Sequence, residues 1–406
     1  MKILYFTESY PYGLGEQWKT NELKILVRHF EDIEVIPFHY NSNHIPVDPI
    51  KGITYHKPLF EKIPNPRVFF KFWSILKSKK RYYFFKEFFK KKIFTIDKFK
   101  QWVSSSFLID ELLRNEILKE KLLRTSSNTI AYFFWGRKSA EIIPLINNSS
   151  VYCFVRLHGY DLYDERYSTR YIPYQDKILH CAHKILTVSN HGKEYLISKF
   201  PSLRDRIKVS YLGTLYAGHS KYSLSYNMTI LSCSSIIPLK RVSLIASALQ
   251  YIKTFSIEWI HIGSGPCRPE VESIAKDFSE NVKFKITGWL PSSEVRQFYQ
   301  ENEVDLFINV SESEGVPVSI MEAMSSGVPV LATDVGGVSE IVNNNNGKLL
   351  DPSIQPEDLA KEITKFFHKS NEEKLSMRKE AYNMFKEKYD AENNALKLVH
   401  LFNSSV

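Results

Sequence analysis

The feature that most restricts the possible folds is the alternation of short apolar runs with helical segments. Apolar runs occur at residues 3–7, 33–40, 129–135 and 151–158, and the pattern returns at residues 228–235, 257–263, 282–289 and 304–311. Strands that read as nearly continuous apolar runs are typical of parallel sheets covered by helices on both faces. The sequence therefore predicts an α/β fold.

A polar stretch rich in Ser, Tyr and Gly interrupts the alternation at residues 214–227, and we place a domain linker there. We therefore expect two facing Rossmann-like domains, each a doubly wound parallel sheet, with a cleft between them. The first would span residues 1–214 and be rejoined by a C-terminal helix at about 385–406. The second would span residues 215–384.

Composition and cysteine use exclude several classes of protein. The chain is 43% hydrophobic, as expected of globular domains. Its four cysteines are widely spaced and form no CxxC pair, so a reducing cytoplasm fits best. No apolar stretch approaches the roughly 20 residues of a membrane span, and the run before Glu8 is brief for a signal peptide. We expect a cytoplasmic protein.

The positive charge is concentrated in one segment. Residues 71–100 hold eleven Lys or Arg against two acidic residues, an excess that equals the net charge of +9 for the whole chain. Aromatic residues are interleaved with these cations, as in the stretch RYYFFKEFFKKKIF. Such a mixture suits an anionic partner surface.

Two glutamates mark the strongest candidate site. Glu314 follows the apolar run at 304–311, and Glu322 lies eight positions further on, inside a helix expected to start at Pro317 and stop at Gly327. Backbone N–H groups near residues 315–318 would point beyond the strand ends, where the helix dipole favours an anion. The loop and helix thus predict an anion site flanked by carboxylates.

The segment DLFINVSESEGVPVSIMEAMSSGVPVLATDVGGVSEIV resembles the signature of the family 4 retaining glycosyltransferases, of group 1 type and GT-B fold. Further stretches agree in order and spacing: KILYFTESYPYGLGEQ, RLHGYDLYDE, PLKRVSLIASAL, IHIGSGP and ITGWLPSSEV. The similarity covers most of the chain, while residues 41–126 match only loosely. It implies a nucleotide-sugar donor held by the second domain and an acceptor held by the first.

The resemblance implies a role for each matching residue. Glu322 would bind the ribose hydroxyls, Glu314 the hydroxyls of the transferred sugar, and Lys240 the donor diphosphate. An arginine usual in the family is replaced by Ser235, and either this serine or Arg241 could compensate for it. The predicted donor-binding set is Gly15, Ser235, Lys240, Arg241, Gly263, Gly288, Trp289, Glu314, Gly315, Val316, Pro317, Val318 and Glu322. The predicted catalytic pair is His158 and Glu314.

The resemblance also implies catalysis without a metal or another cofactor, because the family lacks the paired-aspartate motif of metal-dependent transferases and nothing in this sequence replaces it. Retention without an evident nucleophile implies front-face displacement, in which the departing phosphate helps to accept the acceptor's proton. Leaving-group charge would then be met by Lys240, Arg241 and backbone dipoles.

The basic aromatic segment has two interpretations. It could attach the protein to the inner face of the cytoplasmic membrane, with cations near anionic headgroups and rings at headgroup depth. Alternatively, its aromatic residues form ordinary core and its lysines are solvated. The cations predicted to contact a membrane or acceptor are Lys79, Lys80, Arg81, Lys90, Lys91 and Lys92.

The leading functional hypothesis is a retaining glycosyltransferase that acts on a glycan or lipid-linked acceptor in bacterial-type polysaccharide or lipopolysaccharide assembly. The alternatives are a sugar-nucleotide epimerase of GT-B fold, a non-catalytic subunit and a nucleic-acid-binding protein. We expect no nucleic-acid partner, because the charge is confined to one segment and no recognised nucleic-acid motif accompanies it.

Overall fold

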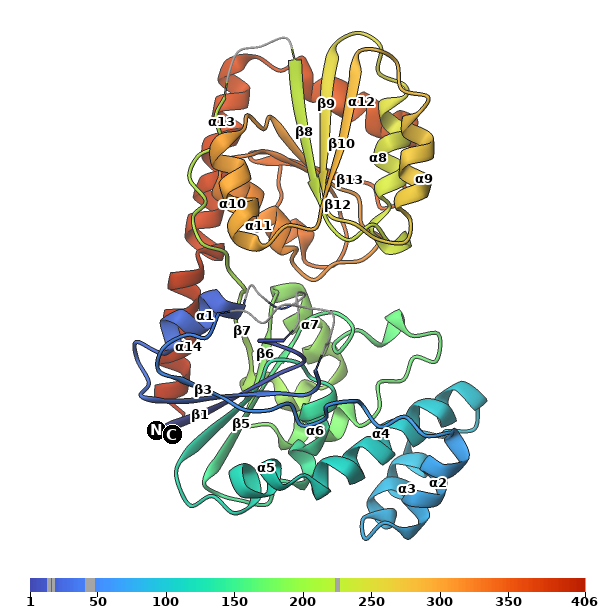
Figure 1. Ribbon diagram of the computed structural model, residues 1–406, viewed down its shortest axis with the longest axis vertical. Coiled ribbons are helices and arrows are strands. Elements are labelled where there is room, and N and C mark those ends of the chain that lie inside the picture. The colour runs from blue at the N-terminus through green and yellow to red at the C-terminus, as the bar shows by residue number, and fades with distance from the viewer. Residues whose placement is uncertain (13–15, 17–18, 41–47, 223–226, 406) are drawn as a thin grey trace. The chain divides into compact units, whose positions relative to one another are not determined.

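The computed structural model describes residues 1–12, 16, 19–40, 48–222 and 227–405, and the chain divides into two compact units (Figure 1). Unit 1 comprises Met1–Val188, Gly192–Ser210 and Ala395–Val406, and unit 2 comprises Ser189–His191 and Tyr211–Asn394. The sequence placed the first boundary at residue 214 and the return to the first domain at about residue 385. Each unit is built on one parallel sheet, so the predicted fold class, two Rossmann-like α/β domains, is confirmed.

The sheet of unit 1 has the strand order β3-β2-β1-β4-β5-β6-β7, with neighbouring strands parallel. Every residue of the central strand β4 is buried, because helices cover both faces. The strands are β1 (Lys2–Thr7), β2 (Asp32–Pro37), β3 (Ile53–Tyr55), β4 (Thr129–Phe133), β5 (Val151–Leu157), β6 (Lys184–Thr187) and β7 (Ile207–Val209). The sequence did not predict β3, whose three residues form no apolar run and include the exposed Thr54.

The helices of this part of the chain are α1 (Lys19–Leu26), α2 (Val68–Lys77), α3 (Arg81–Lys90), α4 (Ile96–Arg114), α5 (Glu116–Leu118), α6 (Gln175–Cys181), α7 (Asn190–Lys199) and α14 (Ala391–Asn403). The helix expected after Gly136 is a 3-10 helix at Lys138–Leu145 that contains Pro144, a residue without the N–H that an α-helix needs. From α14, Phe402 packs its ring 5.4 Å from that of Tyr132, between centroids.

The basic aromatic segment folds into α2, α3 and the start of α4, which Figure 1 shows grouped at one end of unit 1. Trp102 is its buried centre, surrounded by Phe72, Phe85 and Phe88. Other apolar side chains of the segment are exposed: Phe69, Phe70, Trp73, Tyr82, Phe89, Phe94 and Ile96. The aromatic residues are thus divided between a core and an apolar surface.

The sheet of unit 2 has the order β10-β9-β8-β11-β12-β13, again with parallel neighbours. Its strands are β8 (Asn227–Cys233), β9 (Ser256–Ile262), β10 (Val282–Gly288), β11 (Leu306–Asn309), β12 (Val330–Thr333) and β13 (Gly347–Leu350). The chain builds outward from β8 in one direction and from β11 in the other. The strand order therefore reverses between these two strands, where open α/β sheets bind their ligands.

Helices cover both faces of this sheet; Figure 1 shows α8 and α9 on one side and α10 and α11 on the other. The helices of unit 2 are α8 (Val242–Leu249), α9 (Arg268–Ala275), α10 (Ser292–Glu301), α11 (Val318–Ser325), α12 (Pro356–Phe367) and α13 (Asn371–Met384). Within the described ranges, no helix combines the length and the apolar character needed to cross a membrane.

Candidate functional site

An ion pair lies at the point where the strand order of unit 2 reverses. Lys240 follows β8 and Glu314 follows β11, and Lys240 Nζ lies 2.5 Å from Glu314 Oε1. Both side chains are largely buried. Asn309, the last residue of β11, places its amide nitrogen 3.5 Å from the same carboxylate oxygen. Two residues 74 positions apart in sequence are therefore brought together, as their places after adjacent strands predict.

The loop after β9 fixes the loop after β8 in place. Ser234 N–H donates to the carbonyl of Ile262, and Ile236 N–H donates to that of Ser264, each at 3.0 Å. Gly263 has φ +144°, and a Cβ there would lie 1.9 Å from the carbonyl oxygen of Ser234. Glycine is required because the two backbones approach so closely. Gly263, a member of the predicted donor-binding set, is thus also a structural contact between the two loops.

The loop after β12 fixes the loop after β11 in the same way. Gly337 N–H donates to the carbonyl of Gly315 at 2.8 Å. Gly336 has φ +58°, and a Cβ on it would lie 2.0 Å from the carbonyl oxygen of Glu314. These contacts hold the backbone of Glu314, which positions its side chain toward Lys240.

Glu322 is buried within α11, with 6% of its surface exposed. Its carboxylate accepts a hydrogen bond from Ser292 Oγ at 3.1 Å. Burial raises the pKa of Glu322 to about 7, and the Ser292 hydrogen bond and the charge of Arg296 oppose this only in part. A carboxylate kept out of water with one weak partner has unused acceptor capacity, which is typical of functional sites.

Helix α11 begins at Val318, one residue later than the sequence predicts. Pro317 is the residue before its first turn, and no side chain caps this end. Its first backbone N–H groups therefore depend on water or a ligand for hydrogen bonds. Val316, Pro317 and Val318 lie at this uncapped end, directly after Gly315.

Arg241 and Ser235 differ in their surroundings and in their unused hydrogen-bonding groups. Arg241 Nε donates to the carbonyl of Val310 at 2.7 Å, and one of its terminal nitrogens is buried with no hydrogen-bond partner among the described residues. Its backbone is left-handed, with φ +47°, a conformation that costs a non-glycine residue on the order of 1 kcal/mol. Ser235 is exposed. Arg241 is the better placed of the two to replace the missing arginine.

The remaining predicted residues are distributed as follows. Gly288, with φ +82°, ends β10 and is followed by the exposed Trp289, at the same edge of the sheet as Lys240. Gly15 lies outside the described residues. Sequence reasoning missed Ser292, which lies within the quoted stretch ITGWLPSSEV and donates to Glu322, and Arg296, which directly follows that stretch and whose charge acts on Glu322.

His158 belongs to unit 1, at the end of β5. Its ring stacks on that of Phe134, at 4.9 Å between centroids, and packs at a tilt against that of Trp135, at 4.1 Å. Burial lowers its pKa, so the imidazole is neutral near pH 7. Asp161 accepts hydrogen bonds from the backbone N–H groups of His158 and Gly136 and thus caps this loop.

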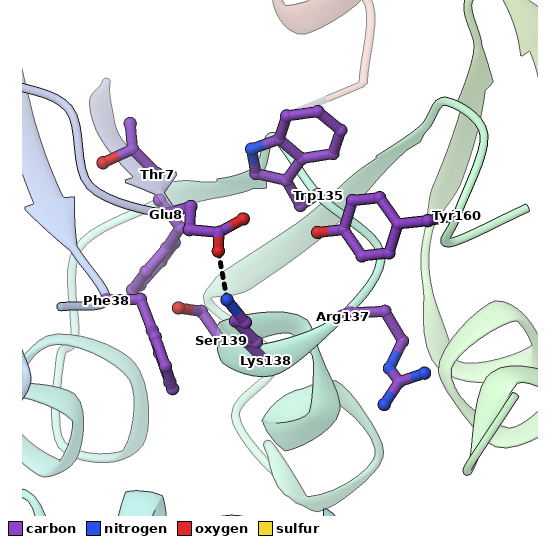
Figure 2. A pocket seen from close by; sticks show the side chains of 9 residues that line it. Thr7, Glu8, Phe38, Trp135, Arg137, Lys138, Ser139 and Tyr160 are labelled. Carbon is purple, nitrogen blue, oxygen red and sulfur yellow. Dashed lines mark hydrogen bonds and ion pairs between the residues drawn. The ribbon is translucent and has the colours of Figure 1, made fainter. Parts of the chain in front are cut away.

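A hollow at the carboxyl edge of β1 and β4 contains residues that the sequence analysis did not single out (Figure 2). Glu8 and Lys138 form an ion pair in it, and Trp135 and Tyr160 line its opposite side. Their positions in the sequence could have indicated them, because Glu8 and Trp135 each lie just after the end of a strand. Among the described residues, no cluster of three or more His, Cys, Asp or Glu side chains could hold a metal ion.

Comparison with known proteins agrees with this geometry. Residues 225–384 match the family model of the glycosyl transferases group 1. This segment contains the Lys240–Glu314 pair and Glu322, and it covers most of unit 2. The family resemblance inferred from the sequence is confirmed to this extent.

Similar proteins include transferases of surface polysaccharides. The chain is 35% identical to the O-antigen biosynthesis glycosyltransferase WbnH of Escherichia coli over 128 residues, 32% of this chain and 34% of that protein. It is 23% identical to the putative colanic acid biosynthesis glycosyltransferase WcaL of E. coli K12 over 218 residues, 52% and 53% of the two chains. The matches thus span about a third to a half of these relatives.

A structural match extends over the whole chain. The Anabaena protein Alr3699/HepE, whose crystal structure is in complex with UDP and glucose, superposes with a TM-score of 0.63 at 16% identity and full coverage of both chains. At this identity the match shows the fold, which is that of the GT-B glycosyltransferases.

Proposed function

We propose that this protein is a retaining glycosyltransferase that moves a sugar from a nucleotide-sugar donor to a glycan or lipid-linked acceptor in bacterial-type polysaccharide or lipopolysaccharide assembly. The observation that carries the proposal is the Lys240–Glu314 ion pair at the strand-order reversal of unit 2. It lies on the segment that matches the group 1 transferases, and relatives such as WbnH and WcaL are named for polysaccharide assembly.

The chemistry of the pair suits a sugar nucleotide. Within the chain, each charge of the pair compensates the other. A donor diphosphate would pair with Lys240 in place of Glu314, and Arg241 and the uncapped start of α11 would also bind it. Glu314 would then be released to accept hydrogen bonds from sugar hydroxyls, and the buried Glu322 would accept the two ribose hydroxyls. The donor itself thus replaces the internal ion pair.

The reaction would proceed on one face of the sugar. The acceptor oxygen bonds to the anomeric carbon on the side from which the diphosphate leaves, and the bond to the diphosphate oxygen breaks. The departing diphosphate takes the acceptor's proton. Lys240 and the backbone dipoles would offset the charge that develops on the leaving group, with no metal ion required.

Slow hydrolysis of the donor tests this without a known acceptor. Proton NMR of the full chain with a panel of UDP-, GDP-, ADP- and dTDP-sugars should show release of a sugar with the donor's anomeric configuration before mutarotation. Glu314→Gln should slow the release, because sugar hydroxyls lose an ionised acceptor. An inverted sugar would contradict retention, and an epimerised one would favour the epimerase alternative.

We also propose that the protein works at the inner face of the cytoplasmic membrane, attached by α2 and α3. Phe69, Phe70 and Trp73 of α2 are more than half exposed. Large exposed apolar patches are rare on soluble proteins and often mark a surface that binds a partner or a membrane. Lys90 and Lys91 are paired with Asp176. The cations that support attachment are therefore the exposed Lys79, Lys80, Arg81 and Lys92.

Vesicle flotation tests the attachment. The protein should float with phosphatidylethanolamine vesicles that contain phosphatidylglycerol, and less with vesicles of neutral phosphatidylcholine. The double variant Phe69→Ser/Trp73→Ser should lose flotation, whereas Tyr251→Ser, at a similarly exposed ring of unit 2, should not. Equal flotation of both variants would contradict attachment through α2.

A further inference from the structure

One face of helix α10 lies beside the carboxyl group of Glu322. Ser292, Arg296 and Tyr299 are spaced i, i+4 and i+7 along this helix, so their side chains share one face. Ser292 donates to Glu322, and the charge of Arg296 acts on it. Figure 1 shows α10 next to α11, the helix that carries Glu322. Two neighbouring helices therefore meet at this carboxyl group.

The side chains that meet there form a hydrogen-bond relay with a defined direction. Arg296 Nη1 donates to Ser292 Oγ at 2.8 Å, and Ser292 Oγ donates to Glu322 Oε1 at 3.1 Å. Because the serine oxygen accepts from the guanidinium, its single proton is free to point at the carboxylate. A hydroxyl that accepts from a cation is also a stronger donor. The relay therefore transmits the effect of a positive charge to Glu322.

Ser292 forms this contact instead of capping its own helix. The residue before the first turn of α10 is Pro291, and no side chain caps that end, although serine is a preferred capping residue. The hydroxyl of Ser292 bonds instead to a carboxylate 30 positions further along the chain. The use of this hydroxyl is therefore explained by Glu322 and not by α10.

Other groups around Glu322 bring no charge of their own near neutral pH. Burial raises the pKa of the Cys233 thiol, at the end of β8, and that of the Tyr299 hydroxyl, so both stay protonated. The Tyr299 hydroxyl is buried and has no hydrogen-bond partner among the described residues. Helix α11 carries no charged residue besides Glu322. Of the described cations, Arg296 is the one whose charge acts on Glu322.

Two opposing effects act on the carboxyl group of Glu322. Burial raises its pKa to about 7, and the Ser292 hydrogen bond and the charge of Arg296 lower it in part. Near pH 7 the ionised fraction therefore depends on these two partners. An ionised carboxylate accepts hydrogen bonds at both oxygens and binds hydroxyl groups more strongly than a neutral carboxyl does. The relay thus sets how well Glu322 can bind a pair of hydroxyls.

We propose that Arg296, acting through Ser292, is a positioning residue that keeps Glu322 ionised and aimed at the ribose hydroxyls of the donor. The inference rests on the proposed function, in which Glu322 binds these hydroxyls. It adds a specificity, because the site takes ribonucleotides in preference to 2′-deoxyribonucleotides. Without the 2′-hydroxyl, a buried carboxylate is left with an unpaired oxygen, which a site of this kind rejects.

Urea unfolding of the full chain without nucleotide tests the relay by itself. The stability of the wild type should fall as pH rises from about 4.5 to 7, because the folded state loses the proton of Glu322. Arg296→Met and Ser292→Ala should each extend this fall upward by about one pH unit, since each removes a group that lowers the pKa of Glu322. Arg296→Lys keeps the positive charge and should retain most of the wild-type profile. In a Glu322→Gln background, neither Arg296→Met nor Ser292→Ala should change the profile.

Calorimetric titration tests the link to ribose. The probes are UDP, GDP and ADP, each compared with its 2′-deoxy form, so that titration of the diphosphate cancels in the ratio of the two affinities. At pH 9 the wild type should bind one ribonucleotide at least tenfold more tightly than its deoxy form. At pH 7, Arg296→Met and Ser292→Ala should lower this ratio about threefold relative to the wild type. At pH 9, where Glu322 is ionised in every variant, the ratios should agree. A merely structural role would change the ratio equally at both pH values.

The matched controls remove polar groups of unit 2 that do not reach Glu322. Gln297→Met breaks a hydrogen bond to Glu301 on the exposed side of α10, and Lys361→Met removes an exposed cation of α12. Both should keep the wild-type profile and ratio.

The inference is overturned if the unfolding profile stays in place in both Arg296→Met and Ser292→Ala. It is also overturned if a nucleotide binds with equal affinity in its ribo and deoxy forms, a result that leaves the proposed donor site intact. If the unfolding profile shifts but no nucleotide binds, the proposed function and the ribose role fail, while the action of Arg296 on Glu322 stands.

Discussion

At the scale of single residues, the buried carboxyl group of Glu322 makes the stability of the folded chain depend on pH. The pKa of Glu322 is about 7 in the folded chain, against 4.5 for the ordinary group. Between about pH 4.5 and 7, the folded state therefore holds the proton of this carboxyl group while the unfolded state releases it. The stability that protonation supplies is present at low pH and is lost as pH rises from about 4.5 through 7.

Glu322→Gln should remove the loss of stability that accompanies deprotonation of this carboxyl group. At pH 8 the variant should be more stable than the wild type by about 2–3 kcal/mol, and at pH 4 the difference should largely vanish. Urea unfolding at the two pH values measures it. Glu362→Gln is the control with the opposite sign, because Lys348 and Lys365 lower the pKa of Glu362 and its loss should destabilise at pH 8. A destabilised Glu322→Gln at pH 8 would contradict the account.

Gly336 tests the contact that holds Glu314. Gly336→Ala should destabilise the chain by more than about 2 kcal/mol, because a Cβ meets the carbonyl oxygen of Glu314 at 2.0 Å in a left-handed backbone. Gly288→Ala shares the left-handed backbone but meets no atom within 4 Å, so it should cost only about 1 kcal/mol. Thermal unfolding compares them, and equal losses would show that the close contact is unimportant.

At the scale of elements, one tryptophan belongs to the core beneath the basic aromatic segment and another to its surface. Trp102 is fully buried and donates its Nε1–H to the carbonyl of Phe84, whereas Trp73 is 52% exposed. Trp102→Ala should cost about 3–5 kcal/mol in urea unfolding and Trp73→Ala less than about 0.5 kcal/mol. Similar costs would mean that α2 is covered in solution.

The sequence predicted the elements whose signals are local. Continuous apolar runs located the central strands, and Pro317 and Gly327 bounded α11 within one residue. It did not predict β3, which pairs with β2 over only three residues, or which aromatic residues of α2–α4 are buried. Those outcomes depend on tertiary packing, which no local pattern records.

In the candidate site, too, some residues could be predicted from the sequence and others could not. Glu314, Glu322 and Lys240 could be predicted because each follows a recognisable strand-to-helix junction. The Lys240–Glu314 pair itself and the pKa of Glu322 depend on burial and distance. The partners Ser292 and Arg296, and the unpaired hydroxyl of Tyr299, likewise became visible only in three dimensions.

At the scale of the whole molecule, each unit contributes one part of the proposed reaction. Unit 2 matches the group 1 transferases over residues 225–384 and holds the buried carboxylate and ion pair. Unit 1 holds the hollow and the exposed rings of α2. The fold match extends over the full chain.

We propose that the strand-order reversal of unit 2 binds a nucleoside diphosphate through Lys240 and Glu322. Calorimetric titration of the full chain with UDP, GDP, ADP and dTDP tests it most directly. We expect one nucleotide to bind, and Lys240→Ala and Glu322→Ala each to weaken it at least tenfold. Lys348→Ala, which breaks another Lys–Glu pair of the same unit at 2.6 Å, should leave the affinity unchanged. Equal affinity in all three variants, or no binding of any nucleotide, would contradict the account.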